Sequence, residues 1–223
     1  PVRQGAPLIE QSVRWVLDYA PHILEVKEAL DEGLQPEQSA VIGLVDAPST
    51  PFPLRNENWN ERLDDVTLGG IRPVAPGTGM SLQMALSYLA TACGIVIAAF
   101  SARRAAEVIG LQADCIQRDD LGKPWLRSFI HKTLQTHGTV PVPEVVASAV
   151  AVLTRLSARA RGITGTAHLF QYNAPGTDTV RWMSRSGAPV FRLGAFTREF
   201  GYFVDVPALA DGTRWTFHPH QFR

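Results

Sequence analysis

The sequence predicts an α+β fold in which helices surround one small antiparallel sheet. A long apolar stretch at residues 81–100 is followed by three short segments with strand character, at 114–117, 125–130 and 138–142. Turn signals separate these segments, and strands so short and so closely spaced pair antiparallel. Helical patterns lie on both sides of them, so we expect the helices and the sheet to share one layered core.

The helices are predicted from the spacing of apolar residues. Between Leu8 and Leu24 these residues recur at three- and four-residue steps, with a kink or break expected at Pro21. Pro143 opens a later helix, since proline suits a first helical turn. The helices expected after the first one cover residues 81–100, 103–110, 143–161 and 195–206.

Three stretches show no regular period. Residues 45–79 are rich in proline and glycine, and a connection of this length in a compact domain is either functional or mobile. Residues 173–192 are typical of a loop. Residues 215–223 begin an element that the printed sequence does not complete, and the absence of an initial methionine indicates a fragment of a longer protein.

The composition indicates a soluble globular protein in a reducing cytosol. Lys and Arg number 21 and Asp and Glu also 21, so the zero net charge gives no support to a nucleic-acid partner. Cys93 and Cys115 form no metal or redox motif and are expected to be buried free thiols. The apolar residues 80–102 could cross a bilayer, but they run into Arg103 and Arg104 and are better explained as a central buried helix. No metal cluster is expected.

The first motif lies directly after this apolar helix. Arg104 is followed three residues later by Glu107, a spacing that places both on one helical face, where the carboxylate can orient the guanidinium. Taken alone, such a pair is usually a solvated surface pair. Arg103 is the rival arginine, and because adjacent helical residues point about 100° apart, only one of the two faces a site. The spacing to Glu107 favours Arg104.

Two further motifs follow in the chain. Residues 129–143 read as a hairpin that carries Lys132 in its turn, beside His131. Residues 219–223 read Pro-His-Gln-Phe-Arg, in which His220 and Arg223 are three positions apart and share a helical face. His218 lies five positions before Arg223 and fits this spacing less well.

Together these motifs resemble the signature of the tyrosine recombinase, or phage integrase, family. The family has an arginine followed by an acid, a hairpin lysine, and a Pro-His-x-Leu-Arg box, which here has Phe222 at the leucine position. The resemblance implies a mainly helical catalytic domain with a three-stranded antiparallel sheet at residues 80–223. Residues 1–79, an N-terminal helix and the irregular connection, are then either part of that domain or a remnant of a core-binding region.

The resemblance implies a site-specific recombinase that cuts and rejoins DNA through a 3′-phosphotyrosyl intermediate. Arg104 and Arg223 would grip the non-bridging phosphate oxygens with forked, permanently charged donors, with Glu107 supporting Arg104. His220 would donate a hydrogen bond or shuttle a proton, and Lys132 would protonate the leaving 5′ oxygen. This chemistry needs neither a metal nor a cofactor.

The family's nucleophilic tyrosine follows the second box, and this chain stops at Arg223. Its tyrosines at 19, 88, 172 and 202 all precede the box, so we expect no nucleophile and no cleavage activity from the chain as printed.

The expected partner is double-stranded DNA, bound by a tetramer of the full-length protein, with no membrane. The protein is expected in the cytoplasm, as a bacterial or phage-encoded product. The side chains expected to make further DNA contacts are Arg103, His131, Arg155 and Arg159. Two alternatives stay open, a type IB topoisomerase-like enzyme and a non-catalytic DNA-binding module of the same fold.

Overall fold

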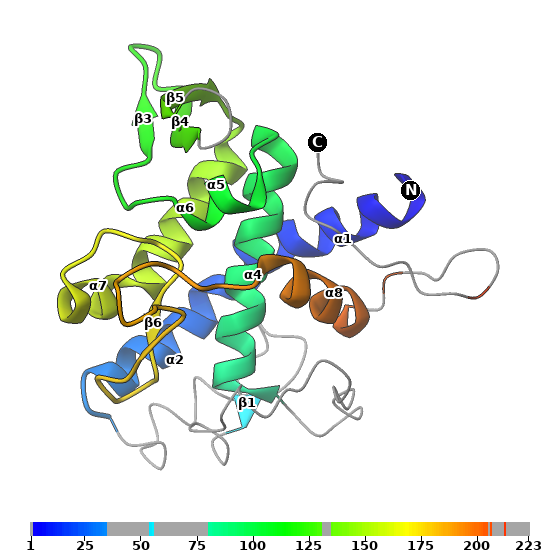
Figure 1. Ribbon diagram of the computed structural model, residues 1–223. Coiled ribbons are helices and arrows are strands. Elements are labelled where there is room, and N and C mark those ends of the chain that lie inside the picture. The colour runs from blue at the N-terminus through cyan, green and yellow to red at the C-terminus, as the bar shows by residue number, and fades with distance from the viewer. Residues whose placement is uncertain are drawn as a thin grey trace.

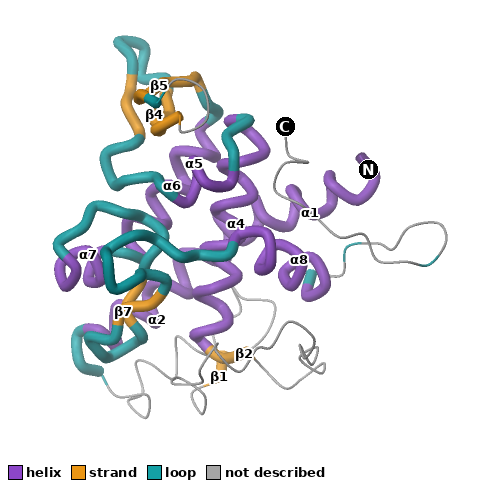
Figure 2. Tube along the Cα trace, viewed as in Figure 1, coloured by secondary structure: helices purple, strands orange, loops and turns teal. Residues whose placement is uncertain are grey.

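The computed structural model describes residues 2–34, 54–55, 80–130, 135–204, 206 and 212. The predicted α+β class is confirmed as mixed helix and sheet, since the structure is 55% helical and holds a small three-stranded antiparallel sheet (Figures 1 and 2). The elements are, in order, α1 (Val2–Arg14), the π-helical turn η1 (Trp15–Tyr19), α2 (Ala20–Asp31), β1 (Leu54–Arg55), β2 (Met80–Ser81), α4 (Leu82–Ser101), α5 (Ala105–Ile109), β3 (Ile116–Arg118), β4 (Pro124–Ile130), β5 (Thr136–Pro141), α6 (Glu144–Leu156), α7 (Ala158–Thr164), β6 (Tyr172–Asn173), β7 (Val180–Arg181) and α8 (Leu193–Phe203).

Helix α4 is the central element of the core, and α1, α6 and α8 pack against it (Figure 1). Every residue from Leu82 to Ala98 is buried except Met84, which is partly buried. Gly94 permits the close approach of α8, because a Cβ atom there would lie 2.7 Å from Cδ1 of Leu193. By length and composition α4 could span a membrane, and 78% of its apolar window is buried among the other elements. A helix that is apolar all round requires such covering.

The chain is helical without a gap from Val2 to Asp31, so no break occurs at Pro21; the irregularity is the π-helical turn η1, which lies between α1 and α2 and ends two residues before Pro21. Pro21 lies in the first turn of α2, where its missing N–H costs no helical hydrogen bond. Trp15 of η1 is buried, and its ring meets that of Phe200 in α8 edge to face at 5.5 Å. The turn thereby joins the N-terminal helices to the core around α4.

The predicted three-strand meander is confirmed as antiparallel, in the order β3-β4-β5, with Ser128 of β4 opposite Gly138 of β5. Asp119 fixes the β3–β4 turn, because its Oδ1 accepts the N–H groups of Leu121 at 3.0 Å and Lys123 at 2.8 Å. The strand bounds differ slightly from the predicted 114–117, 125–130 and 138–142.

The single helix expected at residues 143–161 is wrong, because the structure has two helices, α6 and α7, on either side of Ser157. Arg161 provides the physical reason. Its Nη2 donates to the carbonyl oxygen of Thr154 at 3.1 Å, and its Nε donates to Oγ of Ser157, also at 3.1 Å. A side chain therefore bonds a carbonyl group that a continuous helix would pair with a backbone N–H.

The loop expected at residues 173–192 contains a short hairpin, in which β6 pairs antiparallel with β7. A buried polar network ties this hairpin to α2. Nζ of Lys27, whose side chain is 2% exposed, donates to Asp31 Oδ2 at 2.5 Å and to Asn173 Oδ1 at 2.9 Å. Nδ2 of Asn173 donates to the other Asp31 oxygen at 2.7 Å, so all three side chains are satisfied by one another.

Some of the remaining predictions are confirmed, and others fall on residues that the structure does not describe. Within the irregular segment 45–79 only Leu54 and Arg55 are described, and they form a short parallel pair with Met80 and Ser81. The helix expected at 195–206 is present as α8, and residues 215–223 lie outside the described part of the chain. Both cysteines are buried free thiols, as predicted.

Candidate functional site

The junction between α4 and α5 presents two adjacent arginines beside the sheet. Helix α4 ends at Ser101, and Ala102 takes a left-handed conformation with φ 53°. Oγ of Ser101 donates to the carbonyl of Ile97 at 2.6 Å. An alanine in this conformation is unusual, since its Cβ atom crowds the following carbonyl group. The turn at Ala102 is what redirects the chain, so that Arg103 and Arg104 leave the axis of α4.

Glu107 does pair with Arg104, but the geometry differs from the expected helical face. The helix predicted at 103–110 begins only at Ala105, and Arg104 precedes it in extended conformation as its N-cap. One Glu107 oxygen accepts the backbone N–H of Arg104 at 3.1 Å, and the other lies 3.5 Å from Nη1 of the guanidinium. Glu107 is 5% exposed and the Arg104 side chain 35%, so a buried carboxylate orients a cation that solvent can reach.

The neighbouring Arg103 turns toward the sheet instead. Its Nη2 donates to the backbone carbonyl of Gly138 in β5 at 3.4 Å. A Cβ atom at Gly138 would lie 2.6 Å from Cδ1 of Ile130, so a larger residue would disturb this contact region. The two arginines therefore have different partners: Arg103 bonds the sheet, and Arg104 pairs with Glu107.

The β4–β5 connection carries two of the other predicted site residues, His131 and Lys132, and both lie outside the described residues. Its described ends are close together, because the N–H of Gln135 donates to the carbonyl of Ile130 at 2.9 Å. Gln135 has a φ of 47°, a left-handed value that serves the tight return of the chain.

The C-terminal motif also falls outside the described residues, with His218, His220 and Arg223. Of the four side chains assigned to catalysis, the structure therefore describes Arg104 alone.

Arg155 and Arg159 lie on another part of the molecule, where both are engaged with acidic groups. Arg155 makes a two-pronged pair with Glu28 of α2, with Nη2 to Oε2 at 2.8 Å, and this bond raises the pKa of Arg155. Arg159 donates to Asp178 at 2.8 Å and to the carbonyl of Asp31 at 2.5 Å. Figure 1 shows α2 and α7 well away from α5 and the sheet. The structure thus brings neither arginine near Arg104.

The tyrosines that the structure describes with their side chains are packing residues. Tyr88 is buried in α4 against Phe203, with ring centroids 5.0 Å apart, and burial raises the pKa of its hydroxyl. Tyr172 is fully buried, 4.4 Å from the ring of Trp182. Tyr19 packs partly buried against the core. The side chain of Tyr202 is outside the described set.

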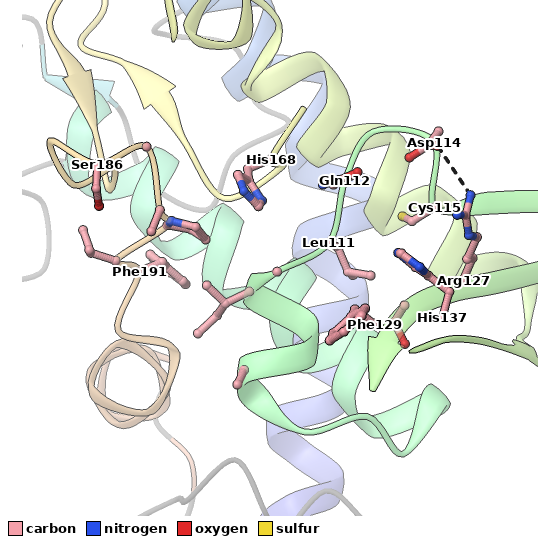
Figure 3. A pocket seen from close by; sticks show the side chains of 18 residues that line it. Leu111, Gln112, Asp114, Cys115, Arg127, Phe129, His137, His168, Ser186 and Phe191 are labelled. Atoms are coloured by element: carbon pink, nitrogen blue, oxygen red, sulfur yellow. Dashed lines mark ion pairs between the residues drawn. The ribbon is translucent and has the colours of Figure 1, made fainter. Parts of the chain in front are cut away.

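Sequence reasoning did not find a cavity of about 760 Å³ that opens beside α5. It is lined by residues from α5 and the loop after it, from β4 and β5, from the segment 186–191, and by His168 of the α7–β6 connection (Figure 3). These residues are far apart in sequence, so no spacing signals them. Alternation along β4 does predict that Ser128 faces inward with Leu126, since strand side chains alternate between faces.

Comparison of the chain with protein-family models, with curated proteins and with solved structures gives no match. Within the described part of the chain, no set of three or more His, Cys, Asp or Glu side chains is placed to hold a metal ion. The Arg104–Glu107 arrangement offers a permanently charged, oriented donor, which is suited to an anionic oxygen such as that of a phosphate.

Proposed function

We propose that this chain is a portion of a site-specific DNA recombinase of the tyrosine recombinase type, with residues 80–223 as its catalytic domain. The observation that carries the proposal is the oriented Arg104. It follows the buried helix α4, is held by the buried Glu107, and stands just before the three-strand meander. This order of elements and this Arg–Glu spacing are those of the family's first signature box.

The proposed chemistry assigns one role to each candidate. Arg104 and Arg223 stabilise the negative charge that develops on the non-bridging phosphate oxygens, an effect for which one donor is typically worth about 3 kcal/mol. Lys132, on the connection between β4 and β5, supplies a proton to the leaving 5′ oxygen, and His220 donates a further hydrogen bond. A tyrosine beyond Arg223 would be the nucleophile. The substrate is double-stranded DNA, held by a tetramer in the cytoplasm.

The first experiment tests whether the assigned residues converge, and it needs no knowledge of the DNA site. Arg104 and Arg223 are replaced by cysteine together, and the protein is treated with a short bismaleimide. The native thiols are buried and do not compete. We expect rapid intramolecular cross-linking between positions 104 and 223. The matched pair, Arg155→Cys with Arg223→Cys, should not cross-link, because Arg155 lies at the C-terminal end of α6, paired with Glu28 of α2 and remote from Arg104. Cross-linking of the 155–223 pair without cross-linking of the 104–223 pair would overturn the assignment of Arg104 and Arg223 to one site.

The second experiment tests the chemistry. The chain is continued past Arg223 with the residues that its gene encodes there and is offered nicked DNA from the sequences flanking that gene. We expect a covalent protein–DNA complex that survives detergent. It should be lost on Arg104→Gln and retained on Arg185→Gln, a matched change at an exposed arginine of the 184–191 segment. A covalent complex that persists without Arg104 contradicts its proposed role. If the gene encodes no tyrosine past Arg223, a non-catalytic DNA-binding module is favoured.

A further inference from the structure

The guanidinium of Arg103 lies against the inward face of the three-stranded sheet. Gly138 of β5 stands directly opposite Ser128 of β4, and residues in such a pair point to the same face. Ser128 is 3% exposed, so this face is the inward one. A Cβ atom at Gly138 would lie 3.7 Å from Nη2 of Arg103, which places the guanidinium there. Arg127 and Phe129 alternate with Ser128 and belong to the other face, which borders the cavity (Figure 3).

Arg103 bonds a carbonyl group of the β4–β5 ladder, not of the free edge of the sheet. The N–H of Val142 donates to the carbonyl of Pro124 at 3.1 Å. Because bonded positions alternate along an antiparallel pair, the same alternation directs the Gly138 carbonyl toward β4. Nη2 of Arg103 reaches this oxygen at 3.4 Å, and a carbonyl oxygen has two lone pairs and can accept twice. Arg103 therefore ties the α4–α5 junction to the strand pair as a unit.

The backbone of the junction holds Arg103 in this position. Ala102 has a φ of 53°, and the N–H of Arg103 donates to Oγ of Ser101 at 3.4 Å. A left-handed alanine is strained and persists only where its surroundings impose it. Arg104 is the next residue in the chain, so the contact that fixes Arg103 on the sheet also fixes the point from which Arg104 projects.

Folding stability alone is a poor explanation of this contact. Among the described residues, Nε of Arg103 is buried and has no hydrogen-bond partner, and the same is true of Oγ of Ser128 on the same sheet face. Buried polar groups without partners lower stability, and apolar side chains of similar shape would avoid that loss. Local features that lower stability are typical of functional sites.

We propose that Arg103 is a positioning residue of the recombinase site, which fixes the β4–β5 strand pair relative to Arg104 and makes no contact with DNA. This inference rests on the proposed function, which requires Arg104 and Lys132, on the connection between these strands, to act at one phosphate. The bond from Arg103 to Gly138 joins the two parts across 35 positions of sequence. Precise alignment matters, because a misplacement of about 1 Å can slow a reaction roughly 100-fold.

The first measurement follows hydrogen exchange of the β5 amides in the 223-residue protein, together with its unfolding in urea. Arg103→Met removes the guanidinium and keeps an apolar stem. We expect the amides of Gly138 and Val140 to exchange about fivefold faster, with a urea midpoint that is unchanged or higher, because a buried unbonded Nε has been removed. Arg185→Met, at an exposed arginine, should alter neither. Unchanged exchange in β5, or a clearly lower midpoint, would overturn the positioning role.

The second measurement is the single-turnover rate of covalent complex formation by the chain continued past Arg223, on the nicked DNA used to test the proposed function. At saturating DNA, Arg103→Met should slow this rate about tenfold or more and leave the Kd for DNA within about twofold. A weaker Kd with an unchanged rate would make Arg103 a DNA contact and overturn the proposal.

Gly138→Ala disturbs the same contact without removing a charge. The added Cβ atom would lie 2.6 Å from Cδ1 of Ile130 and beside Arg103, so the side chains over Gly138 must shift. This variant should also form the covalent complex more slowly, and the double variant with Arg103→Met should be no slower than the slower single variant. Fully additive losses would contradict a shared contact.

The parent protein separates failure of the positioning role from failure of the proposed function. A parent chain that forms no covalent complex overturns the recombinase proposal and the positioning role with it. An active parent chain whose Arg103→Met variant reacts at the parent rate overturns the positioning role alone.

Discussion

Glu107 holds Arg104 at two points, by accepting its backbone N–H at 3.1 Å and by lying 3.5 Å from its guanidinium Nη1. The first bond caps helix α5, and the second orients the side chain. The same carboxylate therefore serves the fold and the candidate site. Substitutions at Glu107 are expected to affect stability as well as any activity of Arg104.

Replacing the buried Glu107 by alanine should lower the free energy of unfolding by about 1–3 kcal/mol, because the part-buried N–H of Arg104 and its guanidinium both lose a charged acceptor. Urea denaturation followed by circular dichroism measures this loss. The matched change Glu144→Ala removes the exposed partner of Arg118 and should cost less. Equal losses of unfolding free energy in the two variants would contradict the expectation that the buried Glu107 stabilises the fold more than the exposed Glu144 does.

Ala102→Gly should stabilise the protein. Ala102 has a φ of 53°, a conformation that costs a non-glycine residue roughly 1–2 kcal/mol, part of which is offset by the greater freedom of glycine in the unfolded chain. The expected net gain is about 0.5–1 kcal/mol, measured as a higher denaturation midpoint. Ala151→Gly, in the exposed interior of α6, should destabilise by about 1 kcal/mol, so the two identical changes are predicted to differ in sign.

Lys27→Met should destabilise the fold by about 3–5 kcal/mol, because it leaves the Asp31 carboxylate and the Asn173 amide oxygen without their buried cation. Thermal and urea denaturation would record the loss. Lys123→Met, at an exposed lysine in the β3–β4 turn, is the matched control and should have little effect. A stability of Lys27→Met close to that of the parent protein would show that the network contributes no net stability.

Glu199 makes stability depend on pH. Burial in α8 raises the pKa of its carboxyl above the ordinary value of 4.5, so the folded state holds this proton more tightly than the unfolded state. Stability contributed by the protonated carboxyl is full below pH 4.5 and is lost as the pH rises through the raised pKa. Glu199→Gln should therefore raise Tm more at pH 7 than at pH 4. Glu32→Gln, an exposed change of the same charge, should show no such difference.

The two thiols should react only after unfolding. Burial raises the pKa of Cys115 to about 12 and also raises that of Cys93, so neither forms appreciable thiolate at pH 8. A chromogenic disulfide reagent at that pH should detect no fast thiol in the native protein and two in urea. A fast native reaction of either cysteine would show that the surrounding packing opens readily.

The sequence predicted the elements with a strong period and missed those set by single contacts. The long apolar run was sufficient to predict α4, and the short strand-like segments with turn signals between them were sufficient to predict the meander. The division of α6 from α7 depends on Arg161 bonding the Thr154 carbonyl, which no period records. The two-residue strands β6 and β7 are too short to show alternation.

In the candidate site, too, sequence spacing predicted a local pairing but not the features that depend on the folded chain. Spacing paired Glu107 with Arg104 correctly, but the left-handed turn at Ala102 places Arg104 before the helix rather than within it. The cavity was missed because Ser128 and His168 come from remote segments that only the folded chain brings together.

The all-round apolarity of α4 limits how the chain can be dissected. Helices α1 and α2 and the turn η1 all contact α4, so a protein expressed from residue 80 onward would lose that cover. The uncovered helix is 20 residues long, or about 30 Å, which matches the hydrocarbon thickness of a bilayer. We expect such a fragment to enter detergent micelles or aggregate, and to be mistaken for a membrane protein.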